Sequence, residues 1–176
     1  MLYRPITDKD ELYTYQEDIE QCYKDNPQIA DYQSVVDFQN TSEAMSLLES
    51  YIDCDESAIL GIYDDNETYL FGFIIFDGIR LTDDGNAAQV HICISRDIWG
   101  KEFQYLYEKI MDDSIFDTLY AMIPSRCRGA ITLCKKLGFK KTGYIPKAIP
   151  YTTLKGEVKM FDELIYTYYK EKKTNG

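Results

Sequence analysis

The chain has 176 residues, 45% of them hydrophobic, and no linker rich in Pro, Gly or Ser. We therefore expect one domain, residues 1–176, that buries roughly 70% of its unfolded surface. Its first residues, MLYRPITDKDE, lack the apolar stretch of a signal peptide, and no segment approaches the roughly 20 apolar residues of a membrane span. The five cysteines form no C-x-x-C pair, which argues against a disulfide framework and a structural metal site. Composition thus predicts a cytoplasmic protein without a membrane segment or a metal.

The two halves of the chain carry net charges of opposite sign. Residues 1–95 hold 4 Lys and Arg against 20 Asp and Glu, a net charge of −16, whereas residues 96–176 hold 15 against 10, a net charge of +5. The total of −11 argues against nucleic-acid binding, which needs clustered Lys and Arg. Basic residues of the second half gather near two predicted helix N-termini, where they either bind a small polyanion or form a solvated helix face. They are Arg96, Lys101, Arg126, Arg128, Lys135, Lys136, Lys140 and Lys141.

The first half predicts a strand, two helices and three more strands. Residues 2–5 are typical of a short strand, and Thr7 with Asp10 forms a capping pattern before the first helix. Apolar residues at helical spacing are Leu12, Tyr15, Ile19, Cys22 and Tyr23 in the first helix, and Ala44, Leu47, Leu48 and Tyr51 in the second. The pattern then predicts strands at 58–63, 68–76 and 87–95 that form an antiparallel meander.

The second half predicts two helices and three strands. Apolar residues at helical spacing return at Phe103, Leu106, Tyr107, Ile110 and Met111, and a strand is expected at 116–123. In SRCRGAITLCKKLGFKKTGY, residues 125–144, Ser125 is expected to cap a helix that the left-handed residue Gly138 ends, with Phe139 packed on its last turn. Strands follow near 140–146 and 157–169. The predicted order is β-α-α-β-β-β-α-β-α-β-β.

This order and two short motifs resemble the GNAT superfamily of acyl-CoA-dependent N-acyltransferases. In that family the central strand is followed by the pattern Q/R-x-x-G-x-G/A. The segment here is AAQVHICISRDIWGKEF, in which Gly100 matches the pattern while Asp97 and Glu102 replace Q/R and G/A. The resemblance covers nearly the whole chain, with its motifs in residues 87–144.

The second motif of the resemblance lies in the helix after residue 125. The family block often reads N-x-x-A-x-x-L-Y-x-x-x-G-F. Here Ala130 and the final Gly138 and Phe139 match, whereas Cys127 and Cys134 stand at the Asn and Tyr positions.

The resemblance implies an α+β fold with a mixed, mainly antiparallel sheet of about seven strands flanked by about four helices. It implies an N-acyltransferase that moves an acetyl or short acyl group from acyl-CoA to a primary amine of a small molecule or protein, with acetyl-CoA as co-substrate. The CoA site that it implies comprises Ile94, Ser95, Arg96, Trp99, Gly100, Lys101, Glu102, Arg126 and Arg128. Backbone N–H groups near Ile94 and Ser95 would bind the pantetheine arm and the oxyanion, and Trp99 either covers the core or stacks on adenine.

Gly100 and Lys101 suit a phosphate cradle, because glycine lets the backbone approach closely and a helix N-terminus carries partial positive charge. Glu102 does not, since a carboxylate about 4 Å from a pyrophosphate oxygen repels it by roughly 1 to 4 kcal/mol. If the loop binds pyrophosphate, we expect the Glu102 side chain to point away from it. If the protein is inactive, we expect that side chain to fill the phosphate site.

Three residues are candidates for the proton transfers of acyl transfer to an amine. His91, the only histidine, lies in a predicted strand on the face opposite Val90 and Ile92. In the family this strand often carries the base, although a hydrogen-bonded core histidine fits the same pattern. Cys134 stands at the position of the family's acid and either protonates the leaving thiolate or packs in the core. Tyr144, near the last strands, is an alternative acid.

Two functions remain open. One is an active N-acyltransferase whose cationic amine approaches from the acidic first half. The other is an inactive GNAT-like fold used as a binding or assembly module, because residues 97, 102, 127 and 134 depart from the family pattern. Similar divergent proteins occur in tailed phages, and the composition suits a phage or an AT-rich bacterium. Either function is compatible with a homodimer in which the apolar C-terminal strand, 157–169, extends a neighbour's sheet.

Overall fold

The computed structural model describes residues 1–27, 41–152 and 156–170. Its elements, in chain order, are β1 (Leu2–Ile6), α1 (Lys9–Thr14), α2 (Gln16–Asp25), α3 (Thr41–Ile52), β2 (Ala58–Tyr63), β3 (Leu70–Thr82), β4 (Gly85–Ile94), the 3₁₀ helix η2 (Arg96–Ile98), α4 (Lys101–Asp113), β5 (Thr118–Pro124), α5 (Arg128–Lys136), β6 (Lys140–Thr152) and β7 (Val158–Tyr169). No helix within the described ranges is both long and apolar enough to cross a bilayer.

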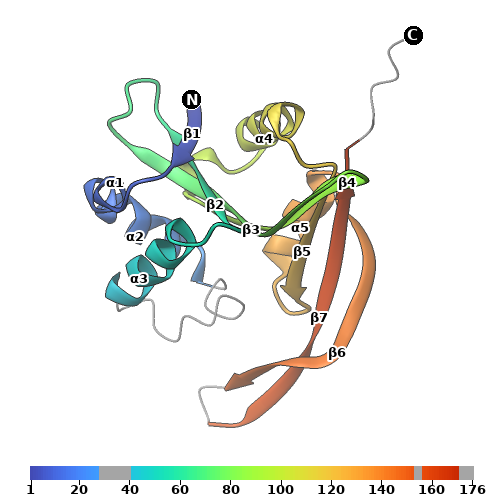
Figure 1. Ribbon diagram of the computed structural model, residues 1–176. Helices are drawn as coiled ribbons and strands as arrows, with labels where there is room; N and C mark the ends of the chain where they lie inside the picture. Colours follow the sequence, from blue (N-terminus) through green and yellow to red (C-terminus); the bar gives the residue numbers. More distant parts are fainter. Residues whose placement is uncertain (28–40, 153–155, 171–176) are drawn as a thin grey trace.

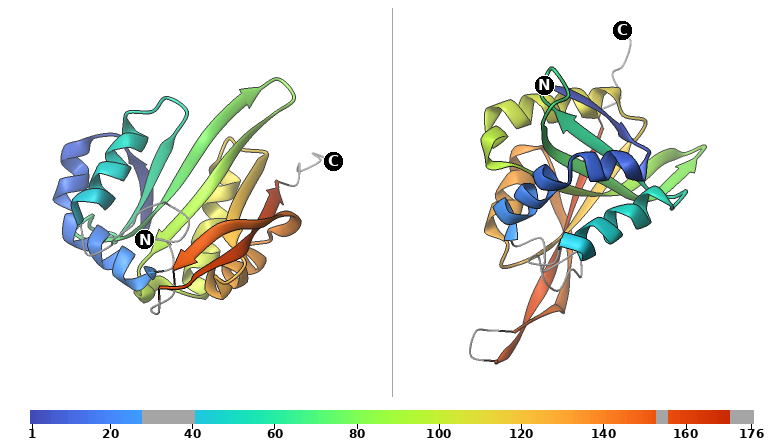
Figure 2. Two further views of the ribbon diagram at one scale, coloured as in Figure 1. Left: turned by 90° about the horizontal axis from the view of Figure 1, so that it is seen from below. Right: turned by 90° about the vertical axis from the view of Figure 1, so that its left-hand side faces the viewer.

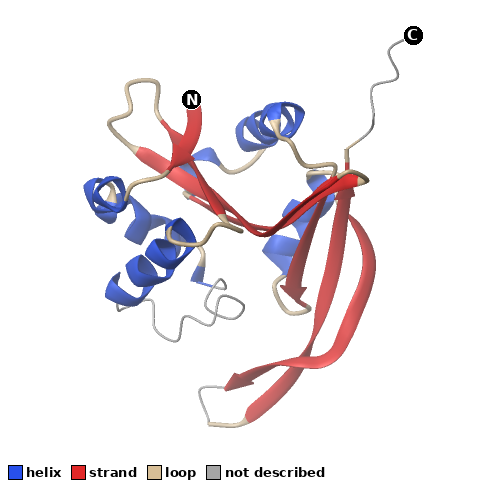
Figure 3. Cartoon of the chain, viewed as in Figure 1, coloured by secondary structure: helices blue, strands red, loops and turns tan. Residues whose placement is uncertain are grey.

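Seven strands form one sheet in the order β1-β2-β3-β4-β5-β7-β6. Strands β4 and β5 are parallel, and the other neighbouring pairs are antiparallel. Figure 3 shows α1, α2 and α3 on one side of β2 and β3, and α4 on the other. Ile19 and Leu48 belong to the core on the first side, and Phe103 and Leu119 to the core on the second. The predicted mixed, mainly antiparallel sheet of seven strands is confirmed, with five α-helices in the described part of the chain.

The first predicted helix is in fact two helices that meet at Tyr15. The backbone of Tyr15, with φ −107° and ψ 23°, leaves the helical range between α1 and α2. The cap of α1 is Asp8, whose Oδ1 accepts a hydrogen bond from the N–H of Asp10 at 2.8 Å. The predicted cap at Thr7 is therefore wrong by one residue. The carboxylate of Asp8 accepts the hydrogen bond from Asp10 N–H, and its negative charge is favourable at the positive end of the helix.

Helix α5 begins at Arg128 with Cys127 as its cap, so the predicted cap at Ser125 is wrong. The N–H of Ser125 donates to the carbonyl of Asp162 in β7 at 2.8 Å. Ser125 thus continues the contact of β5 with β7, and the helix starts only after the chain has left the sheet.

The other end of α5 follows the predicted pattern. Gly138 has φ 84°, and the N–H of Phe139 donates to the carbonyl of Cys134 at 2.9 Å. The side chain of Phe139 is buried against the core. This confirms the left-handed stop that a glycine permits at low cost.

Strands β4 and β5 stay together over a short distance only. They form three residue pairs, Ala87 with Thr118, Ala88 with Leu119, and Gln89 with Tyr120. Beyond these pairs the remaining residues of both strands, 90–94 and 121–124, have no pairing with each other in the described chain. The sheet therefore opens between its two central strands.

Strands β6 and β7 form a long hairpin whose far end projects beyond the other strands (Figures 1 and 2). Residues 163–169 of β7 pair with β5 on one side, and residues of β6 flank its other side. Within β7, only residues 158–162 lack a neighbouring strand on one edge in the described part of the chain. Extension of a partner's sheet through β7 is thus restricted to this segment, and Pro146 and Pro150 interrupt the donors along the outer strand β6.

Candidate functional site

The main candidate site is a cavity of about 390 Å³ where the ends of α2 and β4 meet the start of α4 and one face of α5. Its volume is typical of small-molecule sites. The residues that line it are Asn26, Ile92, Ile94, Trp99, Gly100, Gln104, Arg128, Gly129, Ala130, Thr132, Leu133, Lys136 and Leu137. The cavity therefore lies beside the point at which β4 separates from β5.

The cavity is positively charged although the chain as a whole is acidic. Among the described residues, Arg128 and Lys136 are the only charged side chains that line it, and both come from α5. Two cations without a carboxylate attract an anion, and the geometry of a guanidinium suits a phosphate.

Gly100 joins the wall of the cavity to the start of α4. Its φ of 110° and ψ of −135° define a conformation that residues with a side chain rarely adopt. As the cap of α4 it makes no side-chain hydrogen bond, so the N–H groups of the first helical turn keep their capacity to bind an anion.

The loop between β4 and α4 uses several of its own donors. The N–H of Ser95 donates to the carbonyl of Phe71 at 2.7 Å, and that of Arg96 donates to Asp25 Oδ2 at 2.9 Å. The hydroxyl of Ser95 accepts a hydrogen bond from the N–H of Asp97 at 3.2 Å. Contrary to expectation, the N–H of Ser95 is not available to a ligand, because β3 already binds it.

The backbone groups of Ile92 and Ile94 point toward the opening between β4 and β5. Along β4, the N–H and C=O groups of successive residues point alternately to the two neighbouring strands. The N–H of Ser95 points to β3, where it bonds to Phe71, so odd-numbered residues of β4 point to β3 and even-numbered ones point to β5. Strand β5 has separated from β4 at this level. The N–H groups of Ile92 and Ile94 therefore face the opening, where an amide-bearing ligand can pair with them.

A smaller hollow of about 40 Å³ continues the main cavity into this opening. The two spaces share Ile92, Ala130 and Leu133 in their walls. Two of the three sequence candidates for proton transfer, His91 and Cys134, line the smaller hollow. The two spaces therefore adjoin, and the smaller one brings His91 and Cys134 next to the main cavity.

His91 lies on the sheet face that α3 covers, as the alternation predicts. Its ring centroid is 6.5 Å from that of Tyr51 in α3. Its Nε2 atom is buried and has no hydrogen-bond partner among the described residues. Burial lowers the pKa of His91 below its ordinary value of 6.5, and the negative charge of Asp77 opposes this shift. The imidazole is therefore neutral at pH 7 and can accept a proton.

Cys134 reaches the smaller hollow from α5, on the other side of the sheet. Its side chain is buried, and burial raises the pKa of its thiol to about 12. An ordinary thiol has a pKa of about 8.5. The pKa of Cys134 is therefore roughly 3 to 4 units higher than that of a leaving thiol, which makes proton transfer from Cys134 to the thiolate unfavourable. Cys134 is a poor acid in this position.

Six residues predicted for the site lie outside both spaces, and two of them, Ser95 and Arg96, belong to the loop between β4 and α4. Tyr144, on β6, is 58% exposed. Arg126 places its guanidinium carbon 3.7 Å from the ring centroid of Tyr151 in the projecting hairpin. Lys101 and Glu102 are exposed at the start of α4.

The structure brings four of the predicted CoA-binding residues into the main cavity: Ile94, Trp99, Gly100 and Arg128. Thr132 and Lys136 also line it. Lys136 belongs to the basic residues that the sequence offered for a small polyanion but was not assigned to the CoA site, and Thr132 was not predicted, although helical spacing from Arg128 at i+4 and i+8 places both on the same face. No sequence pattern predicted that Asn26 lines the cavity, because its position depends on how the end of α2 packs against β4.

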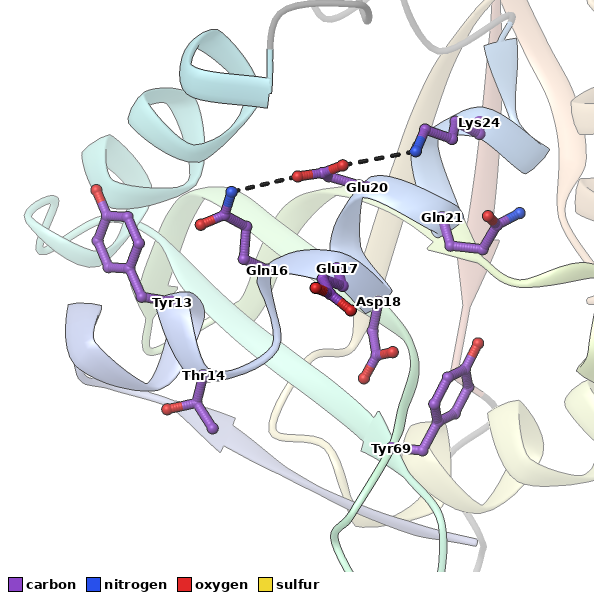
Figure 4. A pocket seen from close by; sticks show the side chains of 9 residues that line it. All are labelled: Tyr13, Thr14, Gln16, Glu17, Asp18, Glu20, Gln21, Lys24 and Tyr69. Carbon is purple, nitrogen blue, oxygen red and sulfur yellow. Dashed lines mark hydrogen bonds and ion pairs between the residues drawn. The ribbon is translucent and has the colours of Figure 1, made fainter.

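A second hollow, of about 750 Å³, lies over α1 and α2 (Figure 4). Its walls carry Glu17, Asp18 and Glu20 against a single Lys24. Glu20 accepts a hydrogen bond from Gln16 at 3.2 Å and pairs with Lys24 at 3.5 Å. None of the sequence-predicted site residues lines this hollow, which adds negative charge to the surface of the first half of the chain.

No protein-family model matches the chain, and no curated protein matches it by sequence. Solved structures match its fold. A single-residue variant of the spermidine N-acetyltransferase SpeG from Vibrio cholerae has 18% identity and a TM-score of 0.67, with 99% of this chain and 96% of that chain covered. A protein from Acinetobacter baylyi ADP1, provisionally assigned as an acetyltransferase, has 18% identity and a TM-score of 0.64, with 96% and 93% covered. The chain therefore has the fold of the GNAT acetyltransferases.

Proposed function

We propose that this protein is an N-acyltransferase that moves an acetyl or short acyl group from acyl-CoA to a primary amine. The observation that carries this proposal is the main cavity at the end of β4. Within the described part of the chain, Arg128 and Lys136 line it and no carboxylate does, and it adjoins the opening beside His91. An anionic carrier with a long amide arm fits this arrangement. Its phosphates would meet the two cations and the start of α4, and its arm would run along β4.

Each residue at the opening then has a separate role in the reaction. The amine nitrogen attacks the thioester carbonyl carbon, a C–N bond forms and the C–S bond breaks, so that CoA leaves as a thiolate. The N–H group of Ile92 or that of Ile94 would stabilise the negative oxygen of the tetrahedral intermediate, because N–H groups two residues apart on a strand are about 6.6 Å apart and cannot share one oxygen. His91 takes the proton that the amine loses. The thiolate takes its proton from solvent, because Cys134 is too weak an acid.

The position of Glu102 favours this reaction over a binding module without catalysis. Its side chain is exposed and lies outside the cavity walls, so it does not fill the cradle. The repulsion that a carboxylate would exert on a pyrophosphate falls off with distance and with exposure to solvent.

The acceptor that fits best is a cationic amine. Residues 1–95 carry a net charge of −16 and supply α1, α2 and α3, which cover the sheet face of His91. The structural neighbours include a spermidine N-acetyltransferase, so polyamines and lysine side chains are the first amines to test. All five cysteines are unpaired, which suits the reducing cytoplasm.

Calorimetry with acetyl-CoA and a thiol-release assay with amines test the proposal together. We expect saturable heat with acetyl-CoA, and release of CoA in the presence of spermidine or a lysine peptide. Absence of heat at millimolar acetyl-CoA would contradict the proposal. Binding without CoA release for any amine would instead identify a binding module.

A further inference from the structure

Asn26 is a buried polar residue in the wall of the main cavity. It follows α2 directly and is 6% exposed. Buried amide side chains normally satisfy their hydrogen-bonding atoms, because an unpaired polar atom away from water is costly. Each polar atom of Asn26 therefore needs a partner, in the protein, in a ligand or in solvent.

The neighbours of Asn26 fix the orientation of its side chain. Its Nδ2 atom lies 2.7 Å from the carbonyl oxygen of Cys22 and 2.7 Å from that of Ile94. Both partners are acceptors, so the nitrogen and not the oxygen must face them, and both of its N–H groups are used. The Oδ1 atom, on the other branch of the planar amide, receives no hydrogen bond from the described residues.

The carbonyl of Ile94 is already occupied. It accepts hydrogen bonds from Asn26 Nδ2 at 2.7 Å and from Trp99 Nε1 at 3.2 Å. A carbonyl oxygen has two lone pairs, so this atom has no capacity left for an N–H group of a ligand. The Oδ1 atom of the same Asn26 amide is an acceptor beside it that no described residue uses.

We infer that Asn26 is a ligand-binding residue whose Oδ1 accepts a hydrogen bond from an amide N–H in the pantetheine arm of acyl-CoA. The inference rests on the proposed function and names one contact within it. The two bonds of Nδ2 hold the acceptor rigidly, so its ordering costs little when the ligand binds. Asn26 thereby replaces the carbonyl of Ile94 as the acceptor at the end of β4.

A comparison of acetyl-CoA with a ligand that lacks the pantetheine arm tests this contact apart from the rest of the site. Adenosine 3′,5′-bisphosphate carries phosphates and adenine like those of CoA but lacks the arm. In calorimetry, Asn26→Ala should weaken acetyl-CoA binding about 5- to 10-fold and leave adenosine 3′,5′-bisphosphate binding within about twofold of wild type. Lys136→Gln serves as the contrasting variant, because loss of a cation from the phosphate site should weaken both ligands.

A second measurement uses the wild-type protein alone and so does not depend on the folding of a variant. Two acetyl-CoA analogues each carry a methyl group on one of the two amide nitrogens of the arm. One of them should bind wild type about 5- to 10-fold more weakly than acetyl-CoA, because its N–H donor is gone.

The outcomes separate the inference from the proposed function. Equal weakening of both ligands by Asn26→Ala, or tolerance of both methylated analogues by wild type, overturns the role of Asn26 while acyl-CoA binding stands. Failure of wild type to bind acetyl-CoA overturns the proposed function and this inference with it.

Discussion

His91 and Cys134 line one hollow of about 40 Å³ from opposite sides of the sheet. His91 lies on β4 and faces α3, whereas Cys134 belongs to α5 and to the core on the other side. Burial acts on both residues, but it keeps the imidazole neutral and the thiol protonated. The proposed base therefore faces one side of the opening, and Cys134 on the other side is a poor acid.

Replacement of His91 by Gln should lower kcat/KM for acetyl transfer by about 10²- to 10⁴-fold, because the base is lost. In wild type, kcat/KM should fall at low pH with a midpoint below 6.5, since burial lowers the pKa of His91 and only the neutral ring accepts a proton. Asp77→Asn removes a charge that raises this pKa, so its midpoint should lie at still lower pH. A low-pH limb that persists unchanged in His91→Gln would contradict the assignment.

Cys134→Ser should leave kcat within about threefold of wild type, because the buried thiol contributes no proton to the leaving group. The measurement is CoA release at saturating acetyl-CoA and amine. A melting curve of the variant controls for the cost of a hydroxyl at this buried position. A loss of 100-fold or more in a folded variant would show that the thiol is the acid after all.

Lys136→Gln should weaken acetyl-CoA binding about tenfold, since a charge-assisted hydrogen bond to phosphate is lost. Lys135→Gln is the matched control, because it makes the same charge change on the same helix at an exposed residue outside the cavity wall. Salt at 0.5 M screens exposed charges at a distance, so it should reduce any effect of Lys135→Gln on acetyl-CoA affinity more than the effect of Lys136→Gln. Equal losses would indicate only general attraction of an anion to α5.

Gly100→Ala should destabilise the protein by about 1 to 3 kcal/mol, because its φ of 110° strains any residue with a side chain. The added methyl would meet no atom within 4 Å, so the cost comes from the backbone alone. Gly129→Ala, in helix α5 and equally free of clashes, should instead stabilise by about 0.5 to 1 kcal/mol. Urea unfolding measures both variants, and equal stabilities would show that the loop at Gly100 adopts another conformation.

Tyr107→Phe should leave the free energy of unfolding unchanged or raise it by about 1 kcal/mol. The hydroxyl of Tyr107 is buried without a hydrogen-bond partner among the described residues, so its removal relieves a desolvation cost. Tyr63→Phe is the contrasting variant: the hydroxyl of Tyr63 donates to Glu11 at 2.9 Å, and its loss should cost about 1 kcal/mol. A larger loss for Tyr107→Phe would reveal a partner for its hydroxyl.

Local patterns in the sequence were sufficient wherever neighbouring residues decide the structure. Alternation placed His91 on its correct face, because a strand has period two and the opposite face is a buried core. Helical spacing identified the buried face of α4, and Gly138 marked the end of α5. These features depend on residues within a few positions of one another.

Contacts between distant segments could not be predicted in the same way. The bond of Asn26 to Ile94 spans 68 residues, and that of Ser125 to Asp162 depends on the strand order β5-β7. Arg126 resembled a phosphate ligand because it precedes a helix, but it stacks on Tyr151 from the projecting hairpin. Ser125 and Arg126 each have a plausible local role that a distant partner overrides.

The short junction of β4 with β5 also bears on how long the protein survives in a cell. Three residue pairs join the two halves of the sheet, which makes this junction a natural place for partial opening. A substrate bound to both β4 and α5 would hold the halves together and lower the population of opened molecules that a protease can attack. With acyl-CoA as the proposed substrate, the abundance of the protein would then rise and fall with the supply of acyl-CoA.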